Sequence, residues 1–334
     1  MTSRDIIRRV LERDHPPRIG LTFSPFNGQS RISDVAGVGP SPDPGFDEAR
    51  YTDDLGGECW RDEWGCLWRR IPGKTKGGEV IEPPIKTWDD LATYRLPSLD
   101  DPARYEAAAQ SVERNSHLYR LGSISACSFN AARYLRRMEQ YLLDCAAEPA
   151  RVKQLNRLVS DLVLAEVSLY AEIGADGVVF CEDWGTQDRL LVSPKMWGEL
   201  FRPDFERLIS HAHSKGLTVW MHSCGQVSDI VPDLVELGMD VLQFDQPDLH
   251  GIDHLAEFHD RVTFWCPVDI QTTLQSGSQA VIQAKAREMV AKLGRGGGFV
   301  AKNYPDDFSI GSDPQWQQWA YEAFVEAGTF RTTH

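Results

Sequence analysis

From about position 100 onward, the sequence alternates short apolar runs with longer segments whose apolar residues recur three and four positions apart. The first pattern is typical of buried strands, and the second is typical of helices with one apolar face. Strands that alternate with helices form a parallel sheet, because each helix carries the chain back to the start of the next strand. The pattern therefore predicts an α/β protein with a parallel sheet at its centre.

The number of strands selects among parallel-sheet folds. Seven strands are expected, and an eighth is expected near Cys66 to Arg70; eight β/α units close into a TIM barrel. An open doubly wound sheet is the main alternative, but its Gly-x-Gly-x-x-Gly phosphate loop is absent from the sequence. The seven strands are expected at 18–23, 118–123, 177–180, 217–221, 241–244, 262–265 and 299–301, and helices at 4–13, 133–147, 152–173, 193–213, 227–237, 253–258, 279–293 and 314–327.

Residues 28–110 interrupt this pattern after the first strand. They contain many of the Gly, Pro and Asp residues and mix loops with short extended pieces. Long loops in compact domains usually serve function. We expect one (β/α)8 barrel domain over residues 1–334, in which 28–110 is a long, irregular, lid-like insertion and 111–330 provides the regular β/α units.

Composition excludes several classes of partner. The net charge of -14 argues against nucleic acid and anionic membranes, both of which require a basic face. No apolar run approaches the roughly 20 residues that span a bilayer, and the charged N-terminal residues do not resemble a signal peptide. Seven cysteines without paired spacing indicate free thiols in a reducing cytoplasm.

Polar and ionisable residues follow the expected strands, which is where barrel enzymes build their active sites. The clearest cluster is His222-Ser-Cys224-Gly, directly after an apolar strand. Side chains two positions apart in an extended chain point the same way, so His222 and Cys224 should project together. An imidazole and a thiolate side by side form half of a zinc-type site.

Other strand ends supply further candidates. Asp183 is a candidate acid for proton transfer, because an apolar surrounding disfavours its charged form. Asp269 and Asp245 either orient His222 or bind substrate, and a purely structural role is the alternative for each. The candidates for substrate binding are Asn27, Trp64, Glu182, Trp184, Gln243, Asp245, Gln271, Asn303 and Tyr304.

Four segments, in this order, resemble the uroporphyrinogen decarboxylase superfamily, which includes cobalamin-dependent and coenzyme M methyltransferases. The resemblance implies the barrel fold that the periodicity also predicts. The segments are Asp62-Glu-Trp-Gly65, Glu182-Asp-Trp-Gly185 leading to Ser193-Pro-Lys-Met-Trp197 and Arg202-Pro203, His222-Ser-Cys-Gly225, and Val268-Asp-Ile-Gln271 with Leu274 and Gly277.

The resemblance also implies a metal. In the zinc methyltransferases of this superfamily, His-x-Cys and one later cysteine hold zinc, which binds a substrate thiol as thiolate. His222 and Cys224 match the first two ligands. The third normally follows the last strand, where this chain has Lys302-Asn-Tyr304 and no cysteine. Cys266 is the expected replacement, and a carboxylate from Glu182 or Asp183 is the other route to a third ligand.

The function implied is a zinc-dependent methyltransferase that moves a methyl group between a small methylated substrate or thiol and a corrinoid. The corrinoid would be carried by a partner protein and walled by Trp60, Trp64 and Trp184, and related barrels often form homodimers. One alternative is a metal-independent decarboxylase in which Asp183 protonates a carbanion. The arginines that hold uroporphyrinogen's carboxylates are missing after the first strand, where Arg31 is the nearest arginine. A non-catalytic ligand-binding barrel is the third possibility.

Overall fold

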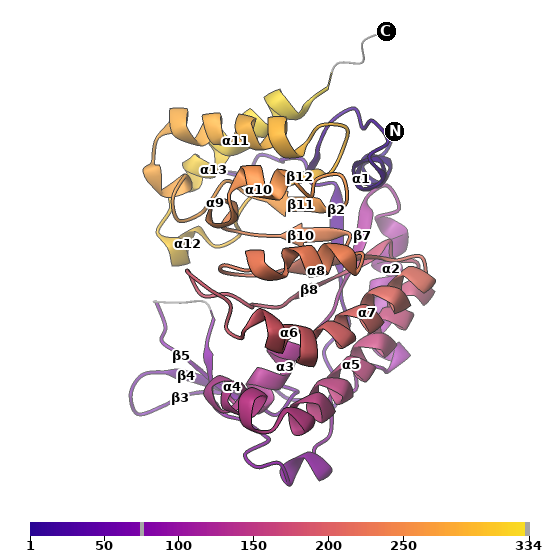
Figure 1. Ribbon diagram of the computed structural model, residues 1–334, viewed down its shortest axis with the longest axis vertical. Coiled ribbons are helices and arrows are strands. Elements are labelled where there is room, and N and C mark those ends of the chain that lie inside the picture. The colour runs from indigo at the N-terminus through magenta and orange to yellow at the C-terminus, as the bar shows by residue number, and fades with distance from the viewer. Residues whose placement is uncertain (74–76, 331–334) are drawn as a thin grey trace.

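An eight-stranded parallel sheet curves into a nearly closed barrel surrounded by helices (Figure 1), in the computed structural model that describes residues 1–73 and 77–330. The neighbouring strands run in the order β1-β12-β11-β10-β9-β8-β7-β2. The predicted TIM barrel is therefore confirmed. The strands are β1 (Gly20–Thr22), β2 (Val35–Val38), β7 (Tyr119–Ser123), β8 (Gly177–Cys181), β9 (Thr218–His222), β10 (Val241–Gln243), β11 (Thr263–Cys266) and β12 (Phe299–Lys302).

The eighth barrel strand is not where the sequence predicted it. It is β2, which pairs in parallel with β7. The predicted segment at Cys66 to Arg70 instead contains β5 (Leu67–Arg70), which belongs to a separate antiparallel sheet with β3 (Arg50–Thr52), β4 (Glu58–Arg61) and β6 (Glu79–Glu82). The prediction failed because β2 has only four residues, Val-Ala-Gly-Val, whose small side chains give a weak strand signal. The segment of β5 has larger side chains and follows a turn, so its sequence resembles a strand more clearly.

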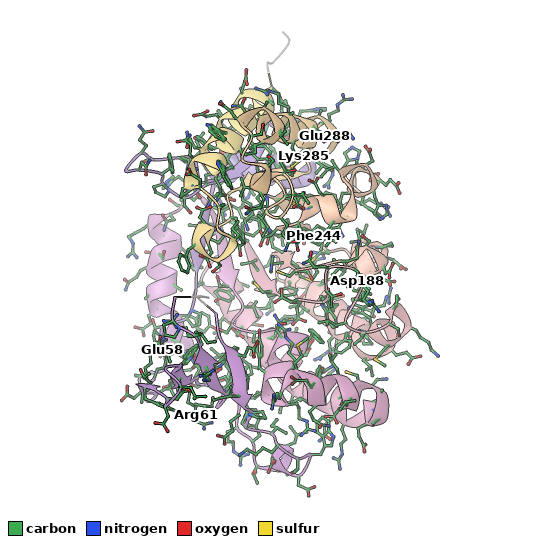
Figure 2. All side chains as sticks on the ribbon, turned by 90° about the vertical axis from the view of Figure 1, so that its left-hand side faces the viewer. Glu58, Arg61, Asp188, Phe244, Lys285 and Glu288 are labelled. Atoms are coloured by element: carbon green, nitrogen blue, oxygen red, sulfur yellow. The ribbon has the colours of Figure 1, made fainter. Side chains whose placement is uncertain are left out.

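The small sheet spans residues 50–82, within the predicted insertion 28–110 and between β2 and helix α2 (Glu106–Arg114); the predicted insertion thus also contains the barrel strand β2. In Figure 1 it lies on the same side of the barrel as α9 (Pro247–His250) and α12 (Asp307–Ile310), which follow β10 and β12. Figure 2 places Glu58 and Arg61 of this sheet at the opposite end of the molecule from Lys285 and Glu288 of α11 (Gln279–Leu293). The insertion therefore projects beside the carboxyl ends of the strands.

Most predicted helices are present, but two expected long helices are each broken into two. The break after α3 falls at Arg137, whose backbone is left-handed (φ 64°). Pro203 interrupts the other, because proline lacks the N–H that would continue the first helix. The helices are α1 (Ser3–Glu12), α3 (Ser128–Leu135), α4 (Met138–Ala147), α5 (Pro149–Glu172), α6 (Pro194–Leu200), α7 (Arg202–Ser214), α8 (Val231–Glu236), α10 (Ile252–Ala256), α11 and α13 (Pro314–Gly328), with 3-10 turns η1 (Asp90–Ala92), η2 (Pro102–Tyr105), η3 (Ser228–Ile230) and η4 (Leu274–Ser276). Within the described ranges, no helix combines the length and apolar character needed to cross a bilayer.

The side chains of each barrel strand alternate between two cores. An inner core joins the apolar face of α1 to inward-facing strand residues, among them Trp220, Val241 and Val300. An outer core, which contains Met221, Leu242 and Ala301 from the same strands, packs against the surrounding helices. This alternation also decides which residues at the strand ends face the barrel mouth.

The seam between β1 and β2 is closed by a buried ion pair. Both terminal nitrogens of the Arg18 guanidinium donate to Asp34, at 2.6 Å each, and the backbone N–H of Leu21 donates to the same carboxylate. Asp34 is fully buried. An antiparallel bridge between Thr22 and Ser33 also crosses the seam. Because no ladder joins β1 to β2, the carboxylate of Asp34 and this bridge together hold the barrel closed.

Replacing Arg18 with Met should therefore lower the free energy of unfolding by about 3–5 kcal/mol, because the carboxylate of Asp34 is left buried without its partner. The double variant Arg18→Met, Asp34→Leu should recover part of this loss. The exposed pair Arg287 and Glu326 is the control, and Arg287→Met should cost less than about 1 kcal/mol. Equilibrium urea unfolding measures all three; equal losses in both single variants would contradict this account of the seam.

Candidate metal centre

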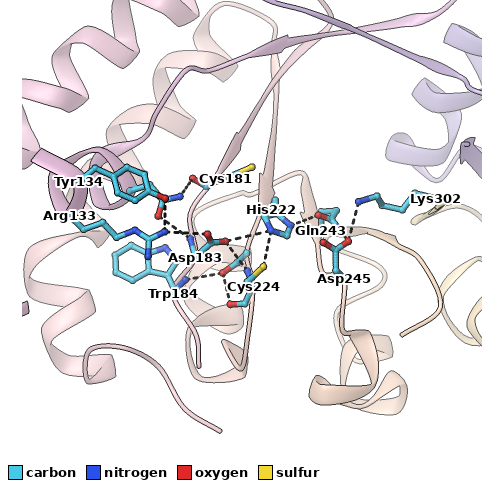
Figure 3. A network of polar contacts seen from close by, with 12 residues as sticks. Arg133, Tyr134, Cys181, Asp183, Trp184, His222, Cys224, Gln243, Asp245 and Lys302 are labelled. Carbon is cyan, nitrogen blue, oxygen red and sulfur yellow. Dashed lines mark hydrogen bonds and ion pairs between the residues drawn. The ribbon is translucent and has the colours of Figure 1, made fainter. Parts of the chain in front are cut away.

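Three potential metal ligands meet at the mouth of the barrel (Figure 3). Asp183, His222 and Cys224 each offer one potential ligand atom, and these three atoms lie within 4.8 Å of one another. Within residues 1–73 and 77–330, no other group of three or more such residues meets this distance. His222 Nε2 lies 3.2 Å from Cys224 Sγ and 3.5 Å from Asp183 Oδ1. We call these three residues the mouth cluster. His222 ends β9 with its side chain 15% exposed, and Cys224 is exposed.

A chain of contacts fixes the tautomer of His222. Lys302 Nζ donates to Asp245 at 3.1 Å, and Gln243 Nε2 donates to the same carboxylate oxygen at 2.8 Å. Burial opposes the charged form of Asp245, but the charge of Lys302 and the hydrogen bonds from Gln243 and Lys302 hold the pKa of Asp245 below its usual range. An ionised carboxylate only accepts, so Gln243 must turn its Oε1 to His222, where it contacts Nδ1. His222 therefore carries its proton on Nδ1 and presents the lone pair of Nε2 to the cluster.

The two oxygens of Asp183 have different partners. Oδ2 accepts from Arg133 of α3 at 3.3 Å, whereas Oδ1 accepts from the backbone N–H of Cys224 at 3.3 Å and faces His222. Arg133 is largely buried and also donates to the hydroxyl of Tyr134. These contacts aim one oxygen of Asp183 at the other two members of the mouth cluster.

The charge around the cluster favours a cation. Although the Cys224 residue reaches solvent, the protein packed around its sulfur atom, and then the carboxylates of Asp183 and Asp245, raise the pKa of the thiol far above its usual range. A metal ion reverses this effect, because it binds the thiolate and compensates the carboxylates. Oxygen, nitrogen and sulfur ligands from three residues match the composition of zinc sites, and three protein ligands leave a position open. The residues of the mouth cluster therefore fit a zinc ion.

Cys266 is not part of the mouth cluster, so its prediction as the third ligand is wrong. It is fully buried, and burial raises the pKa of its thiol to about 12. Its neighbour Trp265 faces the inner core, so Cys266 faces the helices. Side chains alternate between the two cores along β11, so the last residue of this strand points away from the barrel mouth, which the sequence did not reveal. Asp183, which together with Glu182 was the other expected source of a third ligand, lies in the mouth cluster.

The same alternation corrects two expected substrate contacts. Glu182 follows the inward-facing Cys181 and turns outward, where it is fully buried, accepts from the backbone of Asn130, and has its pKa raised to about 8 by burial. Trp184 is also fully buried and stacks on Phe129 at 4.0 Å, so it cannot wall a bound partner. Both residues support the loop that carries Asp183.

Asp269 lies apart from the mouth cluster and has a structural role. Its carboxylate accepts from the backbone N–H groups of Asp248, Gln271 and Thr272 and from the Thr272 hydroxyl, which fixes the loop after β11. These contacts support the structural alternative for Asp269, and its catalytic role stays a prediction. Gln271 is exposed on the same loop.

The remaining candidates are dispersed around the mouth. Asn303 and Trp265 line a cavity of about 390 Å³ that Lys302 also borders, and the Asn303 side chain accepts from the backbone of Ser24. Tyr304 is half-buried, while Asn27 is exposed in a turn after β1, with φ 46°. Trp64 lies on the insertion, in the turn between β4 and β5.

Sequence reasoning missed Arg133 and Lys302. Lys302 ends a strand on the same face as the inward Val300, and this parity could have identified it. Arg133 lies within α3 and reaches Asp183 only because α3 packs over the loop after β8. Nothing in the sequence around Arg133 signals that contact.

The tautomer of His222 is directly testable. Because Gln243 accepts the proton on Nδ1, His222 should be in the Nδ1–H form, and nitrogen NMR of ¹⁵N-histidine-labelled protein should show this tautomer. Asp245→Asn frees the Gln243 amide to turn over, so a mixture of both tautomers should appear. His222→Gln assigns the resonance. A dominant Nε2–H form in the unsubstituted protein would contradict the proposed contact chain.

Comparisons with known proteins agree with this architecture. The family model described as "Uroporphyrinogen decarboxylase (URO-D)" matches residues 69–303. No curated protein sequence matches the chain. Among solved structures, a methyltransferase from Methanosarcina mazei is 17% identical, with a TM-score of 0.59 over 79% of this chain and 76% of that one. A D-psicose 3-epimerase from Clostridium cellulolyticum H10 is 9% identical, with a TM-score of 0.40 over 72% of this chain and 86% of that one.

At these identities, the structural likeness to the methyltransferase shows the fold alone, and the epimerase carries no weight. The family assignment rests on the sequence match, which covers well over half of the chain. It also includes the strand-end segments that hold the mouth cluster. The chain belongs to the uroporphyrinogen decarboxylase (URO-D) family.

Proposed function

We propose that this protein is a zinc-dependent methyltransferase that moves a methyl group between a small methylated substrate or thiol and a corrinoid on a partner protein. The observation that carries the proposal is the mouth cluster, in which Asp183 Oδ1, His222 Nε2 and Cys224 Sγ lie within 4.8 Å of one another. The description of a structural relative as a methyltransferase supports the reaction class.

Asp183, His222 and Cys224 would hold the zinc. A zinc ion at this position would lower the pKa of a bound substrate thiol, so that the thiolate is available as nucleophile at neutral pH. Gln243 keeps the proton of His222 on Nδ1, away from the cluster, and Arg133 keeps one oxygen of Asp183 turned aside. The ligand atoms are thus oriented before the metal binds.

A cavity beyond the carboxyl ends of β1 and β12 supports a small-molecule substrate. It has a volume of about 390 Å³ and is bordered by Ser24, Trp265, Lys302 and Asn303. Lys302 lies over the Trp265 ring, with Nζ 5.2 Å from the ring centroid. A molecule in this cavity would meet an aromatic surface, an amide and an ammonium group, which suits a substrate with a short polar or anionic tail.

Zinc content tests the ligand set. Protein purified without chelators should contain one zinc per chain. Asp183→Ala, His222→Ala and Cys224→Ala should each lose it, and Cys266→Ala is the matched control that should keep it. Asp183→Cys should retain zinc, because it restores a three-ligand set. Elemental analysis makes the measurement; less than about 0.1 zinc per chain in the unsubstituted protein, or loss only in Cys266→Ala, would overturn the assignment.

Methyl transfer tests the reaction. Methylcobalamin with a panel of small thiols should lose its methyl group in the presence of the zinc-loaded protein, followed by the change in corrinoid absorbance. Chelation or Cys224→Ala should reduce the rate by at least about 10²-fold, since the thiolate is then no longer stabilised. Carbon dioxide release from carboxylated substrates that survives chelation and is lost in Asp183→Asn would favour a decarboxylase instead. Tight corrinoid binding without any turnover would indicate a binding protein.

A further inference from the structure

A second cavity, of about 130 Å³, lies where the insertion packs on the barrel. Trp64, Trp68 and Tyr134 provide aromatic walls, and Cys66, Ala126 and Ala131 are among the other lining residues. We call it the aromatic chamber. The tryptophans come from the small sheet and its turn, whereas Ala126, Ala131 and Tyr134 come from α3 and the loop before it. Neither part of the chain forms the chamber alone.

The aromatic walls are held in place by their own contacts. Trp68 donates its indole N–H to Asp62 at 2.6 Å and packs edge-on against Tyr134, with ring centroids 4.8 Å apart. The backbone carbonyl of Trp64 accepts from the hydroxyl of Tyr94 at 2.9 Å. A site whose walls are already ordered binds without the entropic cost of ordering them.

The polar groups of the chamber are almost all paired. Asp62 accepts from Trp68 and from the backbone N–H of Cys66, and the hydroxyl of Ser125 donates to Glu166. The hydroxyl of Tyr134 accepts from Arg133 at 3.0 Å, and within the described part of the chain its own hydrogen has no acceptor. The chamber thus combines apolar walls with one hydrogen-bond donor.

We propose that the aromatic chamber binds a small neutral aromatic ring that carries one hydrogen-bond-accepting oxygen, as in an aryl ether. The volume is close to that of the roughly 150 Å³ apolar cavity that binds benzene in another protein. Flat walls favour a flat ring, because aromatic faces and edges pack at close range. The oxygen substituent would accept from Tyr134.

The position of Tyr134 places that oxygen on the side of the mouth cluster. Arg133 touches the Tyr134 hydroxyl at 3.0 Å and Asp183 at 3.3 Å, so one side chain separates the chamber's donor from a metal-ligand candidate. The binding proposal depends on the chamber alone. Its extension, that the bound ring is the methyl-bearing substrate, rests on the proposed function.

Titration calorimetry with anisole, benzene and methoxycyclohexane tests the chamber. Anisole should bind the unsubstituted protein with one-to-one saturation, and methoxycyclohexane should bind more weakly. Ala131→Leu, which fills the chamber, should abolish saturable binding. Ala126→Leu is a second filling variant at a partly exposed position, should Ala131→Leu fail to fold. Ala107→Leu, on the exposed face of α2, is the matched control and should bind as the unsubstituted protein does.

Tyr134→Phe tests the orientation of the ring. It should weaken anisole binding by roughly three- to tenfold, the effect of one neutral hydrogen bond, and leave benzene binding unchanged. No saturable anisole binding, or unchanged binding in a folded filling variant, would overturn the proposal. Zinc content is measured on the same samples: the filling variants should keep the zinc, so that failure of the chamber and failure of the metal site are distinguishable.

Discussion

The alternation of side chains along the barrel strands is the constraint on which the site depends. The last inward residue of β9 is His222, that of β10 is Gln243 and that of β12 is Lys302, and the register of β9 with β10 places Gln243 directly beside His222. A shift of one residue in any of these strands would turn its polar end into the outer core. The apolar packing of the two cores, which sets the register, therefore also fixes which polar groups meet at the mouth.

The polar groups at the mouth form a chain of contacts with a cation at each end, and this arrangement affects whether a metal ion could bind between them. Arg133 pairs with Asp183 at one end, and Lys302 pairs with Asp245 at the other. Arg133 contacts Oδ2 of Asp183, whereas Oδ1 of Asp183 faces His222. Lys302 contacts Asp245, which lies outside the mouth cluster. The mouth cluster is thus anchored from both sides, and its centre suits the proposed divalent cation.

The insertion adds what a plain barrel lacks. The barrel's inner core fills its interior with side chains such as Trp220, so space for a ligand has to be built at the mouth. The small sheet does this by bringing Trp64 and Trp68 against α3. Because Tyr134 and Arg133 are adjacent on α3, the same helix borders the chamber and orients Asp183. Substitutions in the insertion are therefore expected to change the proposed aromatic chamber while leaving the mouth cluster in place.

The sequence alone determined the barrel and the pair His222 and Cys224, because both depend on local periodicity: apolar spacing defines strands and helices, and residues two apart in a strand share a face. It could not locate β2, whose pairing with β7 is a long-range contact, nor decide which of Asp183, Glu182 and Cys266 lies beside His222 and Cys224. That choice depends on where each strand ends relative to its neighbours and on which way its last side chain turns. Only the closed barrel, with α3 packed across the loop after β8, brings Asp183 to His222 and turns Cys266 away.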